Sequence, residues 1–253
     1  MVAIPYTVYR RIPRRIPKTL GFSRYCLYFN RTLATYVQIP DDPSLNFGPN
    51  QDFRVEFFFR PNLLGTRQGM YMKFVDDGPG IRGYYVRFED INAIRANIVF
   101  NGGWSANAFS RALSLGVLYY VTVNFDRDGN ITIYINGDST GATLANIAAM
   151  AGNDLSNSYN PRIGIEPGNA LEGYLDGFLI YDSIGSVDDI LYNMMEYHAP
   201  IDDMHLWLDF EEGQGLVTND RSDQGNHGAL LPALNPPAWT RVQKWGPRVE
   251  IGL

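Results

Sequence analysis

The sequence has one cysteine, three histidines and no long apolar run, and each shortage excludes a class of protein. A disulfide framework or a cysteine-based zinc site needs several sulfur atoms at one point, so a single cysteine excludes both. A membrane-spanning helix needs about 20 consecutive apolar residues, and no such run is present. The first 18 residues also lack the apolar segment of a secretory signal. The sequence therefore predicts neither a membrane span nor export by that signal.

Acidic residues are missing from the first 24 positions. This arm carries six cations, at Arg10, Arg11, Arg14, Arg15, Lys18 and Arg24. Residues 25–253 therefore hold a formal charge of −12 within the net −6 of the chain. The tetrad Arg-Arg-Ile-Pro occurs twice in tandem, and its prolines favour an extended arm over a helix. Such an arm can bind nucleic-acid phosphates, an anionic membrane surface or the acidic body of another copy, and the alternative is a solvated, disordered arm.

From residue 25 onward, short runs alternate apolar and polar side chains and are separated by Gly, Asn, Asp and Pro. In residues 53–60 every second side chain is apolar, from Phe53 to Phe59, so these side chains should face a core. Further strands are expected at 25–30, 35–39, 71–75, 84–88, 96–100, 119–125, 131–136, 162–165, 173–181 and 205–210. The short intervals between them predict an all-β sandwich.

Two local signals accompany the strands. Residues 126–130 separate two strand-like runs, and Asp128-Gly129 is the pair that supplies positive φ in a tight hairpin. Residues 187–197 predict the one short helix, because Ser186 can cap it and Asp188 and Asp189 lie in its first turn. We expect this helix to cover the sandwich.

Motifs for catalysis are missing. Glycoside hydrolysis needs two carboxylates on either side of one glycosidic bond, and neither Glu89-Asp90 nor the acidic residues of 209–212 have that spacing. These clusters are expected to be solvated charges at strand ends. The sequence also lacks a Gly-x-Ser-x-Gly elbow and a phosphate-binding loop followed by a helix. Cys26 lies in an apolar strand, where a small buried side chain is expected. The sequence therefore predicts a protein that is not an enzyme.

Several blocks together resemble a known family. Residues 28–30, 34–46 and 53–61 are followed in order by 115–123, by Ile-Thr-Ile-Tyr-Ile-Asn-Gly at 131–137, by Gly-Tyr-Leu-Asp-Gly at 173–177, and by 186–190. These blocks resemble laminin-G-like jelly rolls of the concanavalin A-like lectin/glucanase superfamily. The resemblance implies a two-sheet antiparallel jelly-roll sandwich. It does not define a function, because this scaffold hosts lectins, glycosidases, adhesion modules and structural domains.

One block stands in an unusual place. Residues 205–215 and 220–230 look like the motif that opens such domains, yet here they come at the end. Either this segment closes its own sandwich as a permuted strand, which we favour, or it pairs with a neighbouring subunit or belongs to a second repeat. We therefore expect a basic arm at 1–24, a jelly-roll sandwich at 25–231 with the permuted segment at 197–231, and an extended Pro-rich tail at 232–253.

Calcium is the cofactor that the sequence favours. The loop from Asp220 to Asn226 offers the hard oxygen ligands that calcium prefers. By resemblance, Asp176 and Asp220 match positions that bind calcium in some relatives. The alternative is structural, with Asp176 capping backbone amides at a strand bend and the Asp220 loop forming a hydrogen-bonded turn.

Sugar binding is a second expectation. Aromatic rings stack on sugar rings while amides bind hydroxyl groups, and Asn101 with Trp104, or Tyr84 with Tyr85, provide such a combination. The alternative for Trp104 is a core residue that anchors a loop.

Three functions follow, in order of preference. The first is a non-enzymatic structural protein of a virus or phage, a capsid, decoration or tail-associated subunit made in the host cytoplasm and released in the virion. Its partners are copies of itself or other virion proteins, with the arm residues Arg10, Arg11, Arg14, Arg15 and Lys18 serving assembly or nucleic-acid binding. The second is a carbohydrate-binding adhesin or lectin module outside the cell or on its surface, and the third is a degenerate glycan hydrolase.

Overall fold

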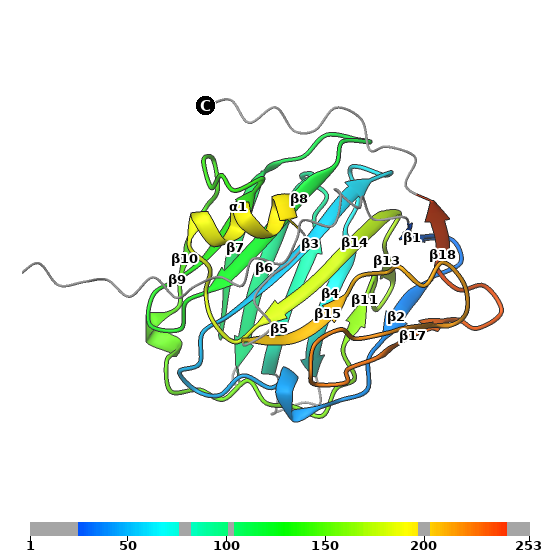
Figure 1. Cartoon of the computed structure of the whole chain (residues 1–253). Helices are drawn as coiled ribbons and strands as arrows, with labels where there is room; N and C mark the ends of the chain where they lie inside the picture. The colour runs from blue at the N-terminus through cyan, green and yellow to red at the C-terminus, as the bar shows by residue number, and fades with distance from the viewer. Residues whose placement is uncertain (1–24, 76–81, 101–103, 197–202, 242–253) are drawn as a thin grey trace, which may run out of the picture.

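The structure is a computed structural model that describes residues 25–75, 82–100, 104–196 and 203–241 (Figure 1). The basic arm and residue Asn101 lie outside these ranges, so the predictions for Arg10, Arg11, Arg14, Arg15 and Lys18 are not tested. In the described part of the chain, no helix has both the length and the apolar character that a membrane span requires.

Two antiparallel sheets form a sandwich, as the sequence predicts. Sheet A contains, in spatial order, β10 (Ala145–Asn146), β9 (Asn130–Ile135), β8 (Tyr119–Phe125), β3 (Phe53–Pro61), β14 (Gly173–Tyr181), β1 (Tyr25–Phe29) and β18 (Ala238–Arg241), and β15 (Met204–Leu208) also pairs with β14. Sheet B contains β16 (Val217–Thr218), β17 (Gly228–Leu231), β2 (Tyr36–Gln38), β11 (Arg162–Ile163), β4 (Gln68–Val75), β5 (Arg82–Phe88), β6 (Ala93–Phe100) and β7 (Trp104–Ala112). A separate small pair consists of β12 (Ile165–Glu166) and β13 (Asn169–Ala170).

The core lies between the two sheets and is rich in aromatic rings. The odd-numbered side chains of β3, from Phe53 to Phe59, are fully buried there, as the alternation predicts. Phe53 stacks on Phe125 of β8 with ring centroids 4.3 Å apart, and it meets Tyr84 of β5 edge to face at 4.7 Å. These contacts join sheet A to sheet B, so the outward side chains of both sheets are held on a rigid frame.

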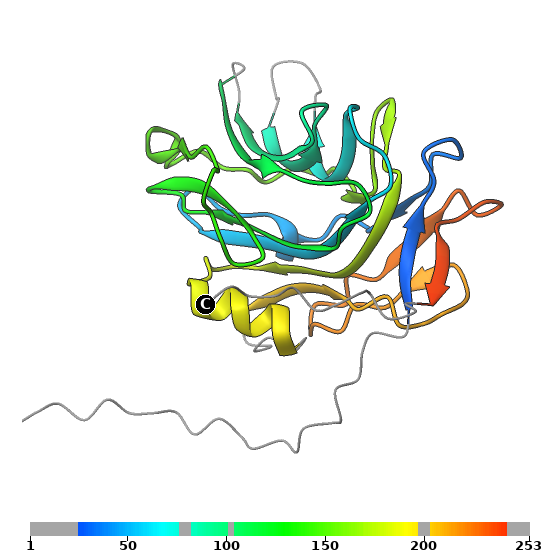
Figure 2. The same ribbon diagram turned by 90° about the horizontal axis from the view of Figure 1, so that it is seen from above.

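Helix α1 (Val187–Glu196) covers the outer face of sheet A, whereas no helix of the described residues covers the outer face of sheet B (Figure 2). Ser186 and Asp189 start this helix with reciprocal hydrogen bonds: Ser186 N donates to Asp189 Oδ2 at 2.9 Å, and Asp189 N donates to Ser186 Oγ at 3.2 Å. Hydrogen bonds from Ser186 lower the pKa of Asp189, which favours the charged form at the positive end of the helix.

The C-terminal segment adds strands to both sheets of its own chain. β15 pairs with β14 in sheet A, while β17 pairs with β2 in sheet B. The sandwich continues beyond the predicted boundary at residue 231. β18 pairs with β1, and Trp239 Nε1 donates to Gly215 O at 2.9 Å. The prolines that suggested an extended tail therefore precede an ordered edge strand.

The hairpin at residues 126–130 joins β8 to β9 as predicted, but the reason given for its glycine is wrong. Gly129 does not have a positive φ. A Cβ at this position would lie 2.2 Å from Asp126 Oδ2, so any other residue requires the Asp126 side chain to move. Strand β7 was not predicted, because its apolar positions are mostly alanine and its alternation ends at Phe109.

Candidate functional site

The outer face of sheet B carries a row of side chains that crosses six neighbouring strands. Cα partners across β2, β11, β4, β5, β6 and β7 place in this row Gln38, Arg162, Met72, Tyr85, Asn97 and Asn107. Neighbouring strands lie about 4.8 Å apart, so the row from Gln38 to Asn107 spans roughly 24 Å. Tyr85, Asn107 and Arg162 are partly exposed, whereas Met72 and Asn97 are buried.

Two arginines next to this row form a network of ion pairs. Arg87 lies between two carboxylates, with Nη1 3.2 Å from Glu166 Oε2 and Nε 3.3 Å from Glu89 Oε1. Arg95 is more exposed, and its Nη1 lies 3.1 Å from the same oxygen of Glu89. The expectation that Glu89 is a solvated charge is wrong, because the two guanidinium groups enclose it and make its burial possible.

Tyr85 lies over this network. The guanidinium carbon of Arg87 is 4.1 Å from the centroid of the Tyr85 ring, and Arg87 Nη2 donates a hydrogen bond to the Tyr85 hydroxyl. Phe74 also contacts Tyr85. The two rings meet edge to face, and their centroids lie 6.0 Å apart. Burial raises the pKa of Tyr85 although Arg87 and Arg95 lower it, so the hydroxyl stays protonated and remains a donor as well as an acceptor.

The prediction that Tyr84 and Tyr85 act together as a sugar platform is wrong for Tyr84. Successive side chains of a strand point to opposite faces, and Tyr84 is fully buried between the sheets. Its hydroxyl donates to Leu45 O at 3.2 Å. Tyr84 is therefore a core residue, and only Tyr85 reaches the outer face.

Two asparagines extend the polar surface beside Tyr85. Asn97 Nδ2 donates to Ala106 O at 2.9 Å and to Asn107 Oδ1, while Arg95 Nε donates to the same oxygen of Asn107 at 2.7 Å. Asn97 is completely buried, yet its Oδ1 has no hydrogen-bond partner within the described ranges. Neither asparagine is among the residues predicted from the sequence. The strand pattern contains a signal for one of them. Asn97 is two positions from Arg95, as Arg87 is from Tyr85, and residues two positions apart in a strand share a face.

The other predicted sugar-binding residues are only partly placed. Trp104 is the first residue of β7 and pairs with Phe100 of β6, which puts its backbone at the end of sheet B. Asn101 lies outside the described residues. The structure therefore brings Trp104 and Tyr85 to one sheet and leaves the Asn101 prediction untested.

Asp220 forms a hydrogen-bonded turn. Its Oδ1 accepts from Trp207 N at 2.8 Å and from Ser222 N at 2.9 Å, and its Oδ2 accepts from Ser222 Oγ and from Asn226 N, both at 2.7 Å. Asn226 Nδ2 in turn donates to His205 O and to Ser44 Oγ at 2.8 Å. The loop thus ties β15 to the chain before β3.

This geometry does not fit a calcium ion on Asp220, because four donors already use the lone-pair directions of its carboxylate. Asp176 is buried in β14 opposite Phe58 of β3. Among the residues that the structure describes, no three His, Cys, Asp or Glu side chains lie together as a metal site. Calcium binding by Asp176, Asp220 and Asn226 remains an untested prediction, which the geometry does not favour.

Cys26 has the surroundings of an unreactive thiol. It is buried in β1, and Sγ lies 3.6 Å from Thr240 O. Burial raises the pKa of the thiol to about 12, and the charge of Asp176 adds to this effect. A thiolate, which is the reactive form, is therefore absent at neutral pH.

Comparisons with known proteins define the family. The family described as the Concanavalin A-like lectin/glucanases superfamily matches residues 31–191, which is more than half of the chain. The chain belongs to this superfamily. The search of curated proteins returned no match.

Solved structures agree on the fold. A candidate carbohydrate-binding protein from Bacteroides ovatus matches with a TM-score of 0.60 and 12% identity, covering 81% of this chain and 57% of that chain. The binding domain of Paraclostridial Mosquitocidal Protein 1 gives a TM-score of 0.52 and 17% identity over 64% of this chain and 41% of that chain. The botulinum neurotoxin serotype G binding domain gives a TM-score of 0.50 and 15% identity over 62% of this chain and 39% of that chain. This superfamily member therefore spans only about half the length of these proteins.

Proposed function

We propose that this chain is a carbohydrate-binding domain that holds glycans on the outer face of sheet B. The observation that carries the proposal is the partly exposed ring of Tyr85 beside the polar groups of Arg95 and Asn107. A sugar ring presents a C–H face, which packs on an aromatic ring, and hydroxyl groups, which bind guanidinium and amide groups. The uncovered side of sheet B offers both kinds of contact (Figure 2).

The comparisons support the class of function without defining the site. The Bacteroides ovatus protein has carbohydrate binding in its name, and the two toxin segments are binding domains. We propose that this chain acts outside the cell or on its surface, where glycans of other cells are accessible.

A glycan array with the full chain tests the proposal. We expect Tyr85→Ala to weaken binding about tenfold or more, because a lost stacking contact is worth on the order of 1.4 kcal/mol. Tyr85→Phe keeps the ring and should stay within about threefold of the wild type. The matched control is Tyr192→Ala, which removes an exposed tyrosine from α1 on the opposite face. Equal binding by Tyr85→Ala and wild type, or no binding to any glycan, contradicts the proposal.

Glycan binding in this proposal is not followed by hydrolysis. Glu89 and Glu166 both form ion pairs with Arg87, which lies on the ring of Tyr85. Hydrolysis needs two carboxylates that face one glycosidic bond from either side, whereas these two side chains are held against the Arg87 guanidinium. A reducing-end assay on β-glucans and galactans should therefore detect no turnover. Turnover that disappears in Glu166→Gln would overturn this part of the proposal.

Assembly into a virion is the other hypothesis, and it rests on the contrast between the arm of residues 1–24 and the acidic body. Deleting the arm should leave the sandwich folded, since every described strand begins at residue 25 or later. If the arm joins copies, the deletion lowers the mass of the native assembly. If it binds nucleic acid, nucleic acid copurifies only with the full chain. A deletion that changes neither removes the support for this hypothesis.

A further inference from the structure

Arg162 of β11 lies on the outer face of sheet B between two tyrosine rings. Its guanidinium carbon is 5.4 Å from the ring centroid of Tyr36 and 5.3 Å from that of Tyr159. All three side chains are partly exposed. Tyr159 is three residues before Arg162 in the sequence, whereas Tyr36 is far from both and comes close because β2 pairs with β11.

Arg162 has no acidic partner among the described residues, unlike three other arginines near it. Arg67 and Arg87 pair with Glu166, and Arg95 pairs with Glu89. In the described part of the chain, no carboxylate lies within 4.0 Å of Arg162. Its Nε is buried and finds no hydrogen-bond partner among those residues.

An uncommitted guanidinium between aromatic rings suits an anionic ligand. The rings remove part of the water from the cation, and unmade hydrogen bonds of a partly desolvated donor are costly. A carboxylate or sulfate restores these bonds in pairs, because its oxygens match the fork of N–H donors on arginine. Neutral hydroxyl groups match this fork less well.

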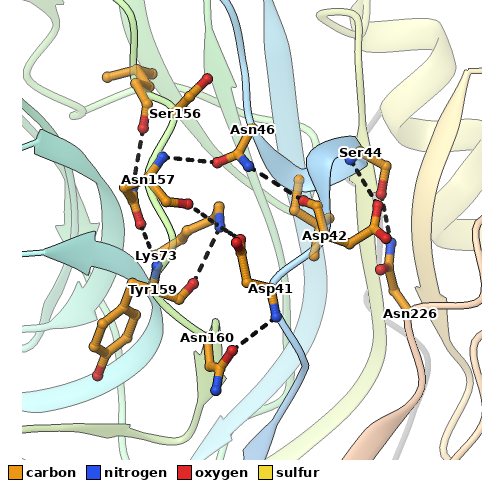
Figure 3. A network of polar contacts seen from close by, with 12 residues as sticks. Asp41, Asp42, Ser44, Asn46, Lys73, Ser156, Asn157, Tyr159, Asn160 and Asn226 are labelled. Atoms are coloured by element: carbon orange, nitrogen blue, oxygen red, sulfur yellow. Dashed lines mark hydrogen bonds and ion pairs between the residues drawn. The ribbon is translucent and has the colours of Figure 1, made fainter.

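Tyr159, beside Arg162, is held by a hydrogen-bond network around the buried Lys73 (Figure 3). Lys73 Nζ donates to Tyr159 O at 3.2 Å, to Asn157 O at 3.1 Å and to Asp41 Oδ1 at 2.6 Å. Tyr159 N also donates to Asn157 Oδ1 at 3.0 Å. These bonds fix the backbone of Tyr159, so one wall beside the Arg162 guanidinium is in place before any ligand arrives.

The position of Arg162 connects it to the proposed sugar platform. Arg162 pairs with Met72, and Met72 pairs with Tyr85 on the next strand. Two strand spacings separate Arg162 from Tyr85 by about 10 Å on the same face, which is on the order of the length of a disaccharide.

We infer that the glycan carries a carboxylate or sulfate group, which Arg162 binds between Tyr36 and Tyr159 while Tyr85 stacks on a neighbouring sugar ring. This inference rests on the proposed function and adds the chemical class of the ligand. The body of the chain has a formal charge of −12, so an acidic glycan must be attracted by a local site and not by the overall charge.

Matched glycan pairs test the inference. The probes are lactose against 3′-sulfolactose and 3′-sialyllactose, and methyl-esterified against free oligogalacturonate. We expect at least one acidic member to bind about tenfold tighter than its neutral partner, and Arg162→Gln to reduce this preference to about twofold. Arg111→Gln on β7 removes the same charge from the same sheet and should keep the preference. Equal binding of neutral and acidic members by the wild type overturns the inference and leaves the proposed function standing.

A second measurement does not need a glycan. Inorganic sulfate is titrated into the full chain while the arginine Nε–Hε signals are followed by NMR. We expect the Arg162 signal to move to saturation and the Arg111 signal to stay in place. Sulfate binding at Arg162 without binding of any glycan supports the anion site and contradicts the proposed function. No movement of the Arg162 signal, together with no preference for acidic glycans, excludes the anion site.

Discussion

The outer faces of the two sheets carry the same three residue types, and only one face is covered. On sheet A, Arg54 pairs with Glu56 at 3.2 Å and its guanidinium lies 3.6 Å from the Tyr181 ring centroid. On sheet B, Arg87 pairs with Glu166 at 3.2 Å and lies over the ring of Tyr85.

Helix α1 makes the difference between these two faces. Asn193 of α1 donates to Glu56 Oε2 at 2.7 Å and to the Tyr181 hydroxyl at 3.2 Å, and Tyr181 is 1% exposed. Tyr85 has no such cover from α1 and is partly exposed. The same chemistry therefore serves packing on sheet A and is open to a ligand on sheet B, so accessibility and not residue type separates the two roles.

The largest effect should come from breaking the covered ion pair. Arg54→Ala leaves the buried Glu56 without its cationic partner, and we expect it to lower the free energy of unfolding by about 3 to 5 kcal/mol. Arg95→Ala on the open face should cost about 1 kcal/mol or less, because that side chain is 21% exposed and water replaces its contacts. Urea denaturation measures both variants. Equal losses would show that the two faces do not differ as described.

Asp220 is a second buried carboxylate, and hydrogen bonds rather than an arginine hold it. Asp220→Ala leaves three backbone N–H groups and the Ser222 hydroxyl without their acceptor, and should lower the free energy of unfolding by about 2 to 3 kcal/mol.

Thermal unfolding of the wild type in millimolar calcium and in chelator should give the same Tm. A Tm that rises with calcium and falls with chelator, and no longer does so in Asp220→Ala, would instead support a calcium site.

The smallest effect concerns pH. Burial raises the pKa of Glu56 above its ordinary value of 4.5, although Arg54, Tyr120 and Asn193 act in the opposite direction. The folded state therefore binds this proton more tightly than the unfolded state, and stability is lost as the pH rises above 4.5 through the folded-state pKa. Glu56→Gln removes this loss, so the difference in unfolding free energy between variant and wild type should grow with pH. A difference independent of pH would mean that burial does not perturb Glu56.

Local patterns in the sequence predict much of the fold. Alternation in residues 53–60 predicts β3, and the capping residues Ser186 and Asp189 lie where α1 begins. The pattern of β5 also contains the separation of Tyr84 from Tyr85, because Tyr84, Val86 and Phe88 form one apolar series. This series already indicates that Tyr84 faces the core and that Tyr85 faces the other way.

Other features depend on contacts that no local pattern contains. β7 is stabilised as a strand by its pairing with β6, because its own alternation is short and consists mostly of small side chains. Arg162 lies in a strand of two residues, and its neighbours Tyr36 and Tyr159 come from a different strand and a loop. Such a site is formed by tertiary structure and is visible only after the strands are paired.

Chemical-shift mapping of a bound glycan on the ¹⁵N-labelled full chain tests most directly whether the uncovered face is the binding face. With the glycan that binds best on the array, the largest shifts should fall on the amide signals of Tyr85, Asn97 and Asn107 and on their neighbours in β5, β6 and β7. Signals of α1 should not move. Largest shifts in α1, or in the loop of Asp220, would place the ligand elsewhere and contradict a binding site on the outer face of sheet B.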